Sequence, residues 1–75
     1  MQTITERDAL VQEVRAGLAR RSLTQDDLAL RLGLTRQAVG RRLTGKVPFT
    51  HPEVRDTADL LGVTIASLYG EKSAA

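Results

Sequence analysis

The sequence predicts an all-α fold, a compact bundle of five short helices. Residues that can cap a helix N-terminus alternate along the chain with glycines that can end a helix, which divides it into short segments. Within these segments the apolar residues recur three or four positions apart, the spacing of one helix face. The only β-like triplet, residues 63–65, is too short to form a strand. We expect one domain, residues 1–70, with helices at 5–21, 25–32, 36–44, 52–61 and 65–69, and a flexible tail at 71–75.

Composition limits the class of protein. A chain of 75 residues with 41% hydrophobic residues makes one small globular domain, and because it has no cysteine, aliphatic helix packing must stabilise it. No apolar run approaches the roughly 18 residues that cross a bilayer. The start of the chain, MQTITERDALVQ, lacks the basic-then-apolar order of a secretory signal. We therefore expect a cytoplasmic protein without a membrane partner.

The first helix has two possible N-terminal caps. Thr5 with Asp8, or Thr3 with Glu6, can form a capping box in which hydroxyl and carboxylate satisfy the first backbone amides. Gly17 lies inside the helix, where glycine costs about 1 kcal/mol relative to alanine. Close approach by a neighbouring helix, or flexibility, can explain its presence. The residues at buried-face spacing are Leu10, Val14, Gly17 and Leu18.

The next two helices have clear boundaries. Thr24 with Asp27 forms the capping box of the second helix, and Gly33 can adopt the left-handed conformation that ends it. Thr35 caps the third helix and Gly45 ends it. Two helices joined by so short a glycine turn cross steeply, which is the geometry of a helix-turn-helix. The buried stripe of the second helix comprises Leu28, Ala29 and Leu32.

The remaining segments complete the core. Phe49 is expected to anchor the loop that follows the third helix, and Pro52 suits the first turn of a fourth helix capped by Thr50 or His51. Gly62 ends that helix. The fourth helix turns Val54, Ala58 and Leu61 inward, and a short fifth helix, capped by Thr64 and ended by Gly70, adds Ile65, Leu68 and Tyr69.

Charge is concentrated around the third helix. The net charge of +2 is a weak signal, but no Asp or Glu lies between Leu28 and Pro52. At 100° per residue, Val39 and Leu43 turn inward, whereas Arg42 falls towards the core rim. The outward face of the third helix holds Arg36, Gln37, Gly40, Arg41 and Thr44, and the acid-free window also contains Arg31, Arg42 and Lys46. Such a basic surface beside Arg and Gln suits the phosphates and base edges of DNA.

One ordered set of residues spans most of the chain: Val14-Arg15, Leu23-Thr24-Gln25, Leu28-Ala29, Leu32-Gly33, Val39, Gly45-Lys46, Ala58, Leu61-Gly62-Val63 and Leu68. Through this set, residues 14–69 resemble the lambda-repressor-like, Cro or Xre-type, helix-turn-helix family of bacterial and phage regulators. The segment GRRLTGKVPFT is similar to small actinobacterial and actinophage repressor-like proteins. Three positions depart from the family pattern. Ser22 stands where the family commonly has glycine, Arg42 stands where it often has an apolar or aromatic residue, and Leu43 stands where it often has glutamate.

The resemblance implies roles for individual residues. In the family, the first turn of the third helix enters the major groove and the first residue of the second helix binds a phosphate. Arg can fork onto guanine and Gln onto adenine, which agrees with this placement. For Arg42, a phosphate contact and a solvated position at the core rim are equal alternatives. The resemblance assigns base reading to Arg36, Gln37, Arg41 and Thr35, and phosphate binding to Gln25, with Thr44, Lys46, Arg42 and Arg31 as weaker candidates.

The sequence therefore predicts a sequence-specific regulator of transcription that binds double-stranded DNA, a phage or bacterial repressor acting as a homodimer on paired half-sites. It would act at the nucleoid, or in the host cytoplasm if phage-encoded. Dimer contacts are expected from the fifth helix, through Ile65, Leu68 and Tyr69, or from the first half of the first helix.

The fold is compatible with other classes of function. A protein-interaction module, such as an antitoxin or anti-repressor, and an excisionase-like recombination factor can share the fold. An enzyme is not expected, because the chain has no nucleophile with a nearby base, no glycine-rich phosphate loop and no carboxylate cluster flanked by histidine. His51 is the only histidine, so no metal site is expected, nor a cofactor or small-molecule ligand.

Overall fold

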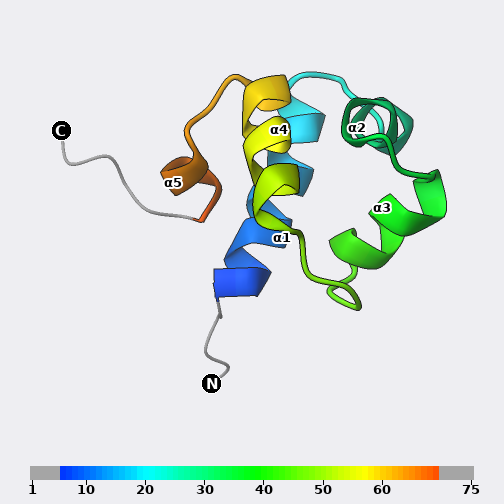
Figure 1. Ribbon diagram of the computed structural model, residues 1–75. Helices are drawn as coiled ribbons and strands as arrows, with labels where there is room; N and C mark the ends of the chain where they lie inside the picture. The colour runs from blue at the N-terminus through cyan, green and yellow to red at the C-terminus, as the bar shows by residue number, and fades with distance from the viewer. Residues whose placement is uncertain (1–5, 70–75) are drawn as a thin grey trace, which may run out of the picture.

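The computed structural model describes residues 6–69 as five helices joined by short loops (Figure 1). No strand occurs within these residues, which confirms the predicted all-α fold. The helices start and end within one residue of the predicted ranges, but the caps proposed for the first helix and the tail lie outside the described residues. The helices are α1 (Glu6–Arg20), α2 (Gln25–Leu32), α3 (Arg36–Leu43), α4 (His51–Leu61) and α5 (Ile65–Leu68).

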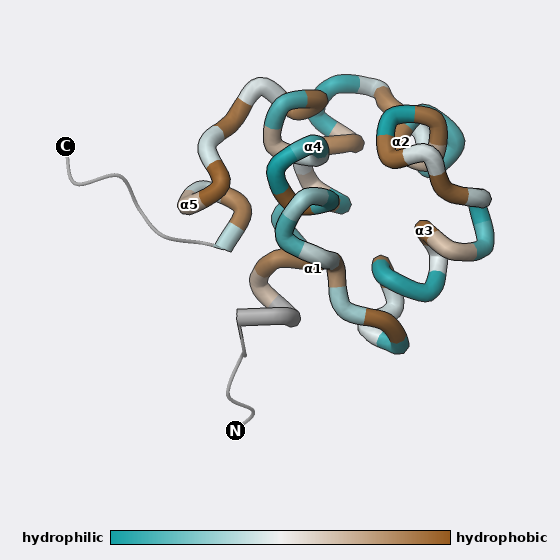
Figure 2. The backbone as a smooth tube through the Cα atoms, in the orientation of Figure 1, coloured by the Kyte–Doolittle hydropathy of each residue, from teal (hydrophilic) through white to brown (hydrophobic). Residues whose placement is uncertain are grey.

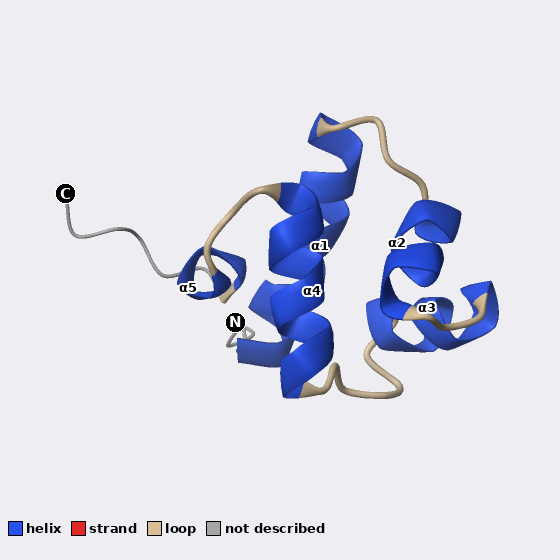
Figure 3. Cartoon of the chain, turned by 45° about the horizontal axis from the view of Figure 1, so that its top comes forward, coloured by secondary structure: helices blue, strands red, loops and turns tan. Residues whose placement is uncertain are grey.

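One apolar core joins all five helices. α1 and α4 lie side by side, with α2 and α3 on one side of them and the short α5 on the other (Figures 1 and 3). Hydrophobic and hydrophilic residues alternate along the helices, as Figure 2 shows, so each helix can turn one face to this core. Phe49 packs against it from the α3–α4 loop, as predicted. The buried apolar residues are Leu10, Val14, Leu18, Leu28, Ala29, Val39, Leu43, Val54, Ala58, Leu61 and Leu68.

Gly17 marks the closest approach of α1 to α4. A Cβ atom at this position would lie 2.7 Å from Cδ1 of Leu61, inside van der Waals contact. The close-approach interpretation of this glycine is therefore confirmed. α2 and α3 pack against this α1–α4 pair.

Four helices, α1 to α4, end in the same backbone motif. After α2, the amide of Leu34 donates to the carbonyl of Ala29 at 2.9 Å, and Gly33 is left-handed with φ 69°. After α3, Gly45 has φ 82° and the amide of Lys46 donates to the carbonyl of Arg41 at 2.9 Å. After α4, Gly62 has φ 68° and the next amide bonds back in the same way. After α1, the left-handed residue is Ser22, with φ 55°. This is the Schellman motif, which satisfies the free carbonyls at a helix C-terminus.

The N-terminus of α4 carries a capping box. Thr50 is the N-cap residue, and its hydroxyl accepts a hydrogen bond from the amide of Glu53 at 3.3 Å. The Glu53 carboxylate accepts one from the Thr50 amide at 3.0 Å. Of the two caps considered for this helix, the structure has Thr50. Within the described residues, no helix has the length and apolarity needed to cross a membrane.

Candidate nucleic-acid interface

The third helix presents a polar face to solvent because its apolar residues are fixed in the core. Val39 is fully buried and Leu43 is nearly so. Thr35 does not project from this face as a free hydroxyl: it is the N-cap, and its Oγ1 accepts a hydrogen bond from the Ala38 amide at 3.1 Å. The side chains of Arg36, Gln37 and Arg41 are exposed, as the sequence predicted for base-reading residues.

Gly40 lies within this exposed face. A Cβ atom built at Gly40 would meet nothing within 4 Å, so the backbone there faces open space. The missing side chain leaves a hollow beside Arg36, Gln37 and Arg41. Another molecule can approach the α3 backbone closely at this point.

Arg42 joins α3 to the start of α4 through a charged pair with Glu53. Its Nε donates to Oε1 at 2.8 Å and its Nη2 to Oε2 at 3.2 Å, while Nη1 donates to the carbonyl of Ala38 at 2.9 Å. Both side chains are only 14% exposed. Burial raises the pKa of Glu53, but hydrogen bonds from Arg42 and Thr50 and the guanidinium charge outweigh it, so the pKa lies below its ordinary value.

This placement corrects the expectation for Arg42. Three of its five guanidinium N–H groups donate within the protein, so the side chain is held in place and links α3 to α4. The solvated rim position is therefore wrong for this mostly buried side chain, whereas a phosphate contact stays a prediction. Glu53 was missed as a functional residue, although its place three residues after Thr50 is the sequence signature of a capping box.

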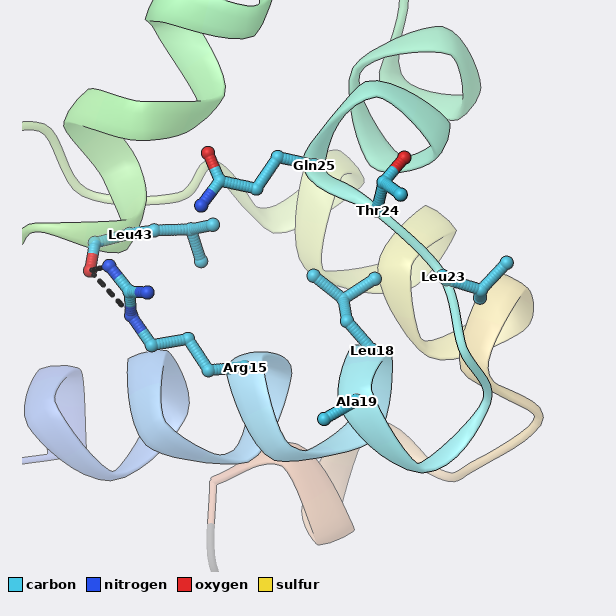
Figure 4. Close-up of a pocket in the computed structure, with 7 residues that line it drawn as sticks. All are labelled: Arg15, Leu18, Ala19, Leu23, Thr24, Gln25 and Leu43. Carbon is cyan, nitrogen blue, oxygen red and sulfur yellow. Dashed lines mark hydrogen bonds between the residues drawn. The ribbon is translucent and has the colours of Figure 1, made fainter.

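Arg15 of α1 holds the other side of α3. Its Nε and Nη2 donate to the carbonyl of Leu43 at 3.2 and 3.0 Å, which satisfies a free carbonyl at the C-terminus of α3 (Figure 4). The guanidinium charge also favours this negative end of the helix dipole. No role for Arg15 could be predicted from the sequence, because a side chain that bonds a backbone carbonyl 28 residues away leaves no local pattern.

A pocket of about 280 Å³ opens beside Arg15, between α1, the start of α2 and the end of α3. Gln25, the first residue of α2, is half-buried there, and its amide points across the pocket toward Leu43 (Figure 4). A polar amide is thus placed at a helix N-terminus, where backbone N–H groups favour anions. The pocket is lined by Arg15, Leu18, Ala19, Leu23, Thr24, Gln25 and Leu43.

The weaker phosphate candidates lie in different surroundings. Thr44 and Lys46 follow α3 directly and are exposed, although the Thr44 hydroxyl donates to the Arg41 carbonyl at 3.1 Å. Arg31, at the end of α2, lies 3.8 Å from the Asp59 carboxylate of α4. The Arg31 guanidinium is therefore directed to α4 rather than towards α3. In this respect Arg31 differs from the phosphate-binding candidates that follow α3.

An acidic residue lies next to the first residue of α3. Asp26 Oδ1 is 3.8 Å from Arg36 Nε, and the two side chains are 68% and 69% exposed. The glycine turn brings the starts of α2 and α3 together, so this ion pair joins the two helices at the surface. The sequence shows Asp26 only as a charge favourable to the N-terminus of α2.

Comparison with known proteins agrees with this geometry. A family model described as helix-turn-helix matches residues 14–68, most of the chain and all of the polar face described above. The comparisons with curated proteins and with solved structures gave no match. A steeply crossed helix pair, with the second helix offering exposed Arg and Gln, is the arrangement of this family. The chain belongs to the helix-turn-helix family of the Cro/C1, lambda-repressor-like type, a family of DNA-binding domains.

Proposed function

We propose that this protein is a sequence-specific regulator of transcription that acts as a repressor, with α3 in the major groove of double-stranded DNA. The observation that carries the proposal is the exposed set Arg36, Gln37 and Arg41 on one face of a helix whose other face is locked in the core. A helix held rigidly reads bases with less loss of conformational entropy than a mobile one. Binding of a promoter by such a helix would occlude the polymerase.

The chemistry of the three side chains suits base reading. Arginine can donate two hydrogen bonds to O6 and N7 of guanine, and glutamine can pair with N6 and N7 of adenine. Each good bidentate pair contributes about 1–3 kcal/mol of discrimination. Thr35 fixes the start of α3 as its N-cap, and because its Oγ1 accepts the capping bond, its O–H can still donate to a base or phosphate.

Phosphate contacts would place the helix in the groove. Gln25 with the exposed amides at the start of α2 supports one contact, and Lys46 and Thr44 after α3 support others. Arg42 and Arg31 stay weaker candidates, because the first binds Glu53 and the second is directed to Asp59.

A binding titration with alanine variants tests the proposal. Arg36→Ala and Gln37→Ala should each lose discrimination of roughly tenfold or more at one or two base positions while keeping most non-specific affinity. Lys46→Ala should weaken all sequences alike and reduce the slope of log K against log salt by about one. The measurement is selection from a random DNA pool, followed by titration against the selected site and single-base changes.

Arg20→Ala is the matched control, since it removes one exposed arginine from the far end of α1 and leaves α3 intact. It should keep the wild-type base preference. Unchanged preference in both Arg36→Ala and Gln37→Ala would show that the proposed reading face is wrong. Failure of the wild-type protein to retain DNA at low salt would favour a protein-interaction module instead.

A further inference from the structure

Asp26 is the one acidic side chain that the structure pairs with a proposed base reader among residues 6–69. It stands second in α2, and its carboxylate lies 3.8 Å from Nε of Arg36, the first residue of α3. Arg41, on the same face of α3, forms no ion pair within these residues. The two arginines therefore differ in what surrounds them.

The α2 cap does not account for Asp26. Asp27 forms the capping box with Thr24: its carboxylate accepts from the Thr24 amide at 2.8 Å, and its own amide donates to the Thr24 hydroxyl at 3.1 Å. Asp26 takes no part in those bonds. An exposed ion pair also contributes little to stability, with a typical value of about 0–1 kcal/mol. Asp26 also favours the helix dipole at the start of α2, but Asp27 already supplies a negative charge there. A carboxylate beside a DNA-binding surface repels phosphates, so the position of Asp26 next to Arg36 needs an explanation of its own.

The geometry of the pair supplies that explanation. The Asp26 oxygen approaches Nε, on the inner edge of the guanidinium, which leaves the two terminal nitrogens of Arg36 free to fork onto a base. An exposed arginine otherwise samples many rotamers, and limiting them lowers the entropy lost on binding. The negative charge of Asp26 also repels a nearby phosphate. A contact of Arg36 with the DNA phosphate backbone is therefore less favourable relative to its contact with a base edge.

We propose that Asp26 is a positioning residue for DNA sequence recognition: its carboxylate aims Arg36 at a base, which increases discrimination and lowers affinity for DNA in general. This inference rests on the proposed function. Asp26 is then a determinant of specificity that touches no base, and the base pair whose recognition depends on it is the one that Arg36 reads.

The test compares Asp26→Asn with Asp59→Asn. Both remove one exposed carboxylate from an ion pair of 3.8 Å, but Asp59 pairs with Arg31 rather than with a base reader. Asp26→Asn should bind non-cognate DNA more tightly and lose about three- to tenfold of the discrimination at the Arg36 position. Asp59→Asn should keep the discrimination of the wild type. In an Arg36→Ala background, Asp26→Asn should change discrimination at that position by less than about twofold, because the residue it positions is gone.

Each outcome separates this inference from the proposed function. A uniform rise in affinity of Asp26→Asn for all sequences, with the base preference kept, would overturn the inference and leave the function standing. An equal loss of discrimination in Asp59→Asn would overturn it too, since total charge rather than position would then be the cause. Lack of any base preference in the wild-type protein would overturn the proposed function, and the inference with it. Thermal unfolding should show all variants folded near the wild-type midpoint.

Discussion

At the end of α1, Ser22 stands where glycine stands after α2, α3 and α4. All four residues are left-handed, with φ of 55°, 69°, 82° and 68°. The surrounding bonds are the same: the amide after Ser22, that of Leu23, donates to the Leu18 carbonyl at 2.8 Å. A residue with a Cβ atom pays about 1–2 kcal/mol to adopt this conformation, whereas glycine adopts it freely. Ser22 is therefore strained in a motif that α2, α3 and α4 complete with a glycine and without strain.

Ser22→Gly should therefore stabilise the protein. We expect a gain of about 0.5–1 kcal/mol in the free energy of unfolding, because relief of the left-handed strain exceeds the extra unfolded-state entropy of glycine. Urea unfolding followed by circular dichroism measures it as a higher midpoint with an unchanged slope. Ser22→Ala is the control, since alanine keeps the strain, and it should not stabilise. A gain in Ser22→Ala equal to that in Ser22→Gly would show that strain is not the cause.

At the scale of the element, α3 is held at two places by arginines from different partners. Arg42 bonds Glu53 at the start of α4, and Arg15 of α1 bonds the carbonyl of Leu43. The apolar residues of α3 fix which face is buried, while these polar bonds limit rotation and sliding of the helix. The Arg42–Glu53 pair does this at only 14% exposure, where solvent screens it less than a surface pair.

Glu53→Gln should weaken the attachment of α3 to α4. It should also reduce the pH dependence of the free energy of unfolding on the acid side. The pKa of Glu53 is lowered in the folded protein, so its stabilising contribution is fully present above the unfolded pKa, about 4.3, and is lost as the pH falls through the folded pKa. At neutral pH the variant should lose about 1–3 kcal/mol, because Arg42 keeps a poorly compensated charge. Below pH of about 4 the difference from the wild type should shrink, as urea unfolding at several pH values would show.

Glu13→Gln provides the comparison for this measurement. Glu13 lies 4.0 Å from Arg20 in an exposed pair on α1. Its loss should change stability little at any pH. Equal effects of the two substitutions would contradict a special role for the Arg42–Glu53 pair.

The helix boundaries could be predicted from sequence, but the polar links between helices could not. Caps and left-handed glycines act within a few residues, so Thr24, Gly33 and Thr35 mark α2 and α3 reliably. Arg42 and Glu53 lie 11 residues apart and meet only because α3 and α4 pack together. The helical projection placed Arg42 near the core rim but could not identify its partner. Likewise, nothing in the sequence shows that Asp26 lies beside Arg36, since the glycine turn sets that distance.

At the scale of the whole molecule, the proposed reading surface is narrow, which would limit how specific a single copy can be. Its three exposed side chains on α3, with Gly40 between them, would read only a few base pairs. The structure leaves less of α5 available for dimer contacts than the sequence predicted. Leu68 is buried in the core, and Ile65 and Tyr69 are only partly exposed. Two copies on DNA therefore remain a prediction that rests on the reading face rather than on a visible interface.

Paired binding should depend on the rotational phase of the two half-sites. Dimers of this motif read half-sites centred about 34–36 Å apart, one helical turn, so that both recognition helices enter the same face of the duplex. Insertion of about 5 base pairs between the selected half-sites turns one to the opposite face and should reduce affinity to that of a single half-site. Insertion of about 10 base pairs restores the face but increases the distance, and should recover binding only if a flexible contact between the two copies can span the longer distance. Titration of the three spacings by gel retardation measures this. Equal affinity at all three would show that each copy reads its site alone, in which case the discrimination supplied by Arg36, Gln37 and Arg41 would have to suffice for one domain.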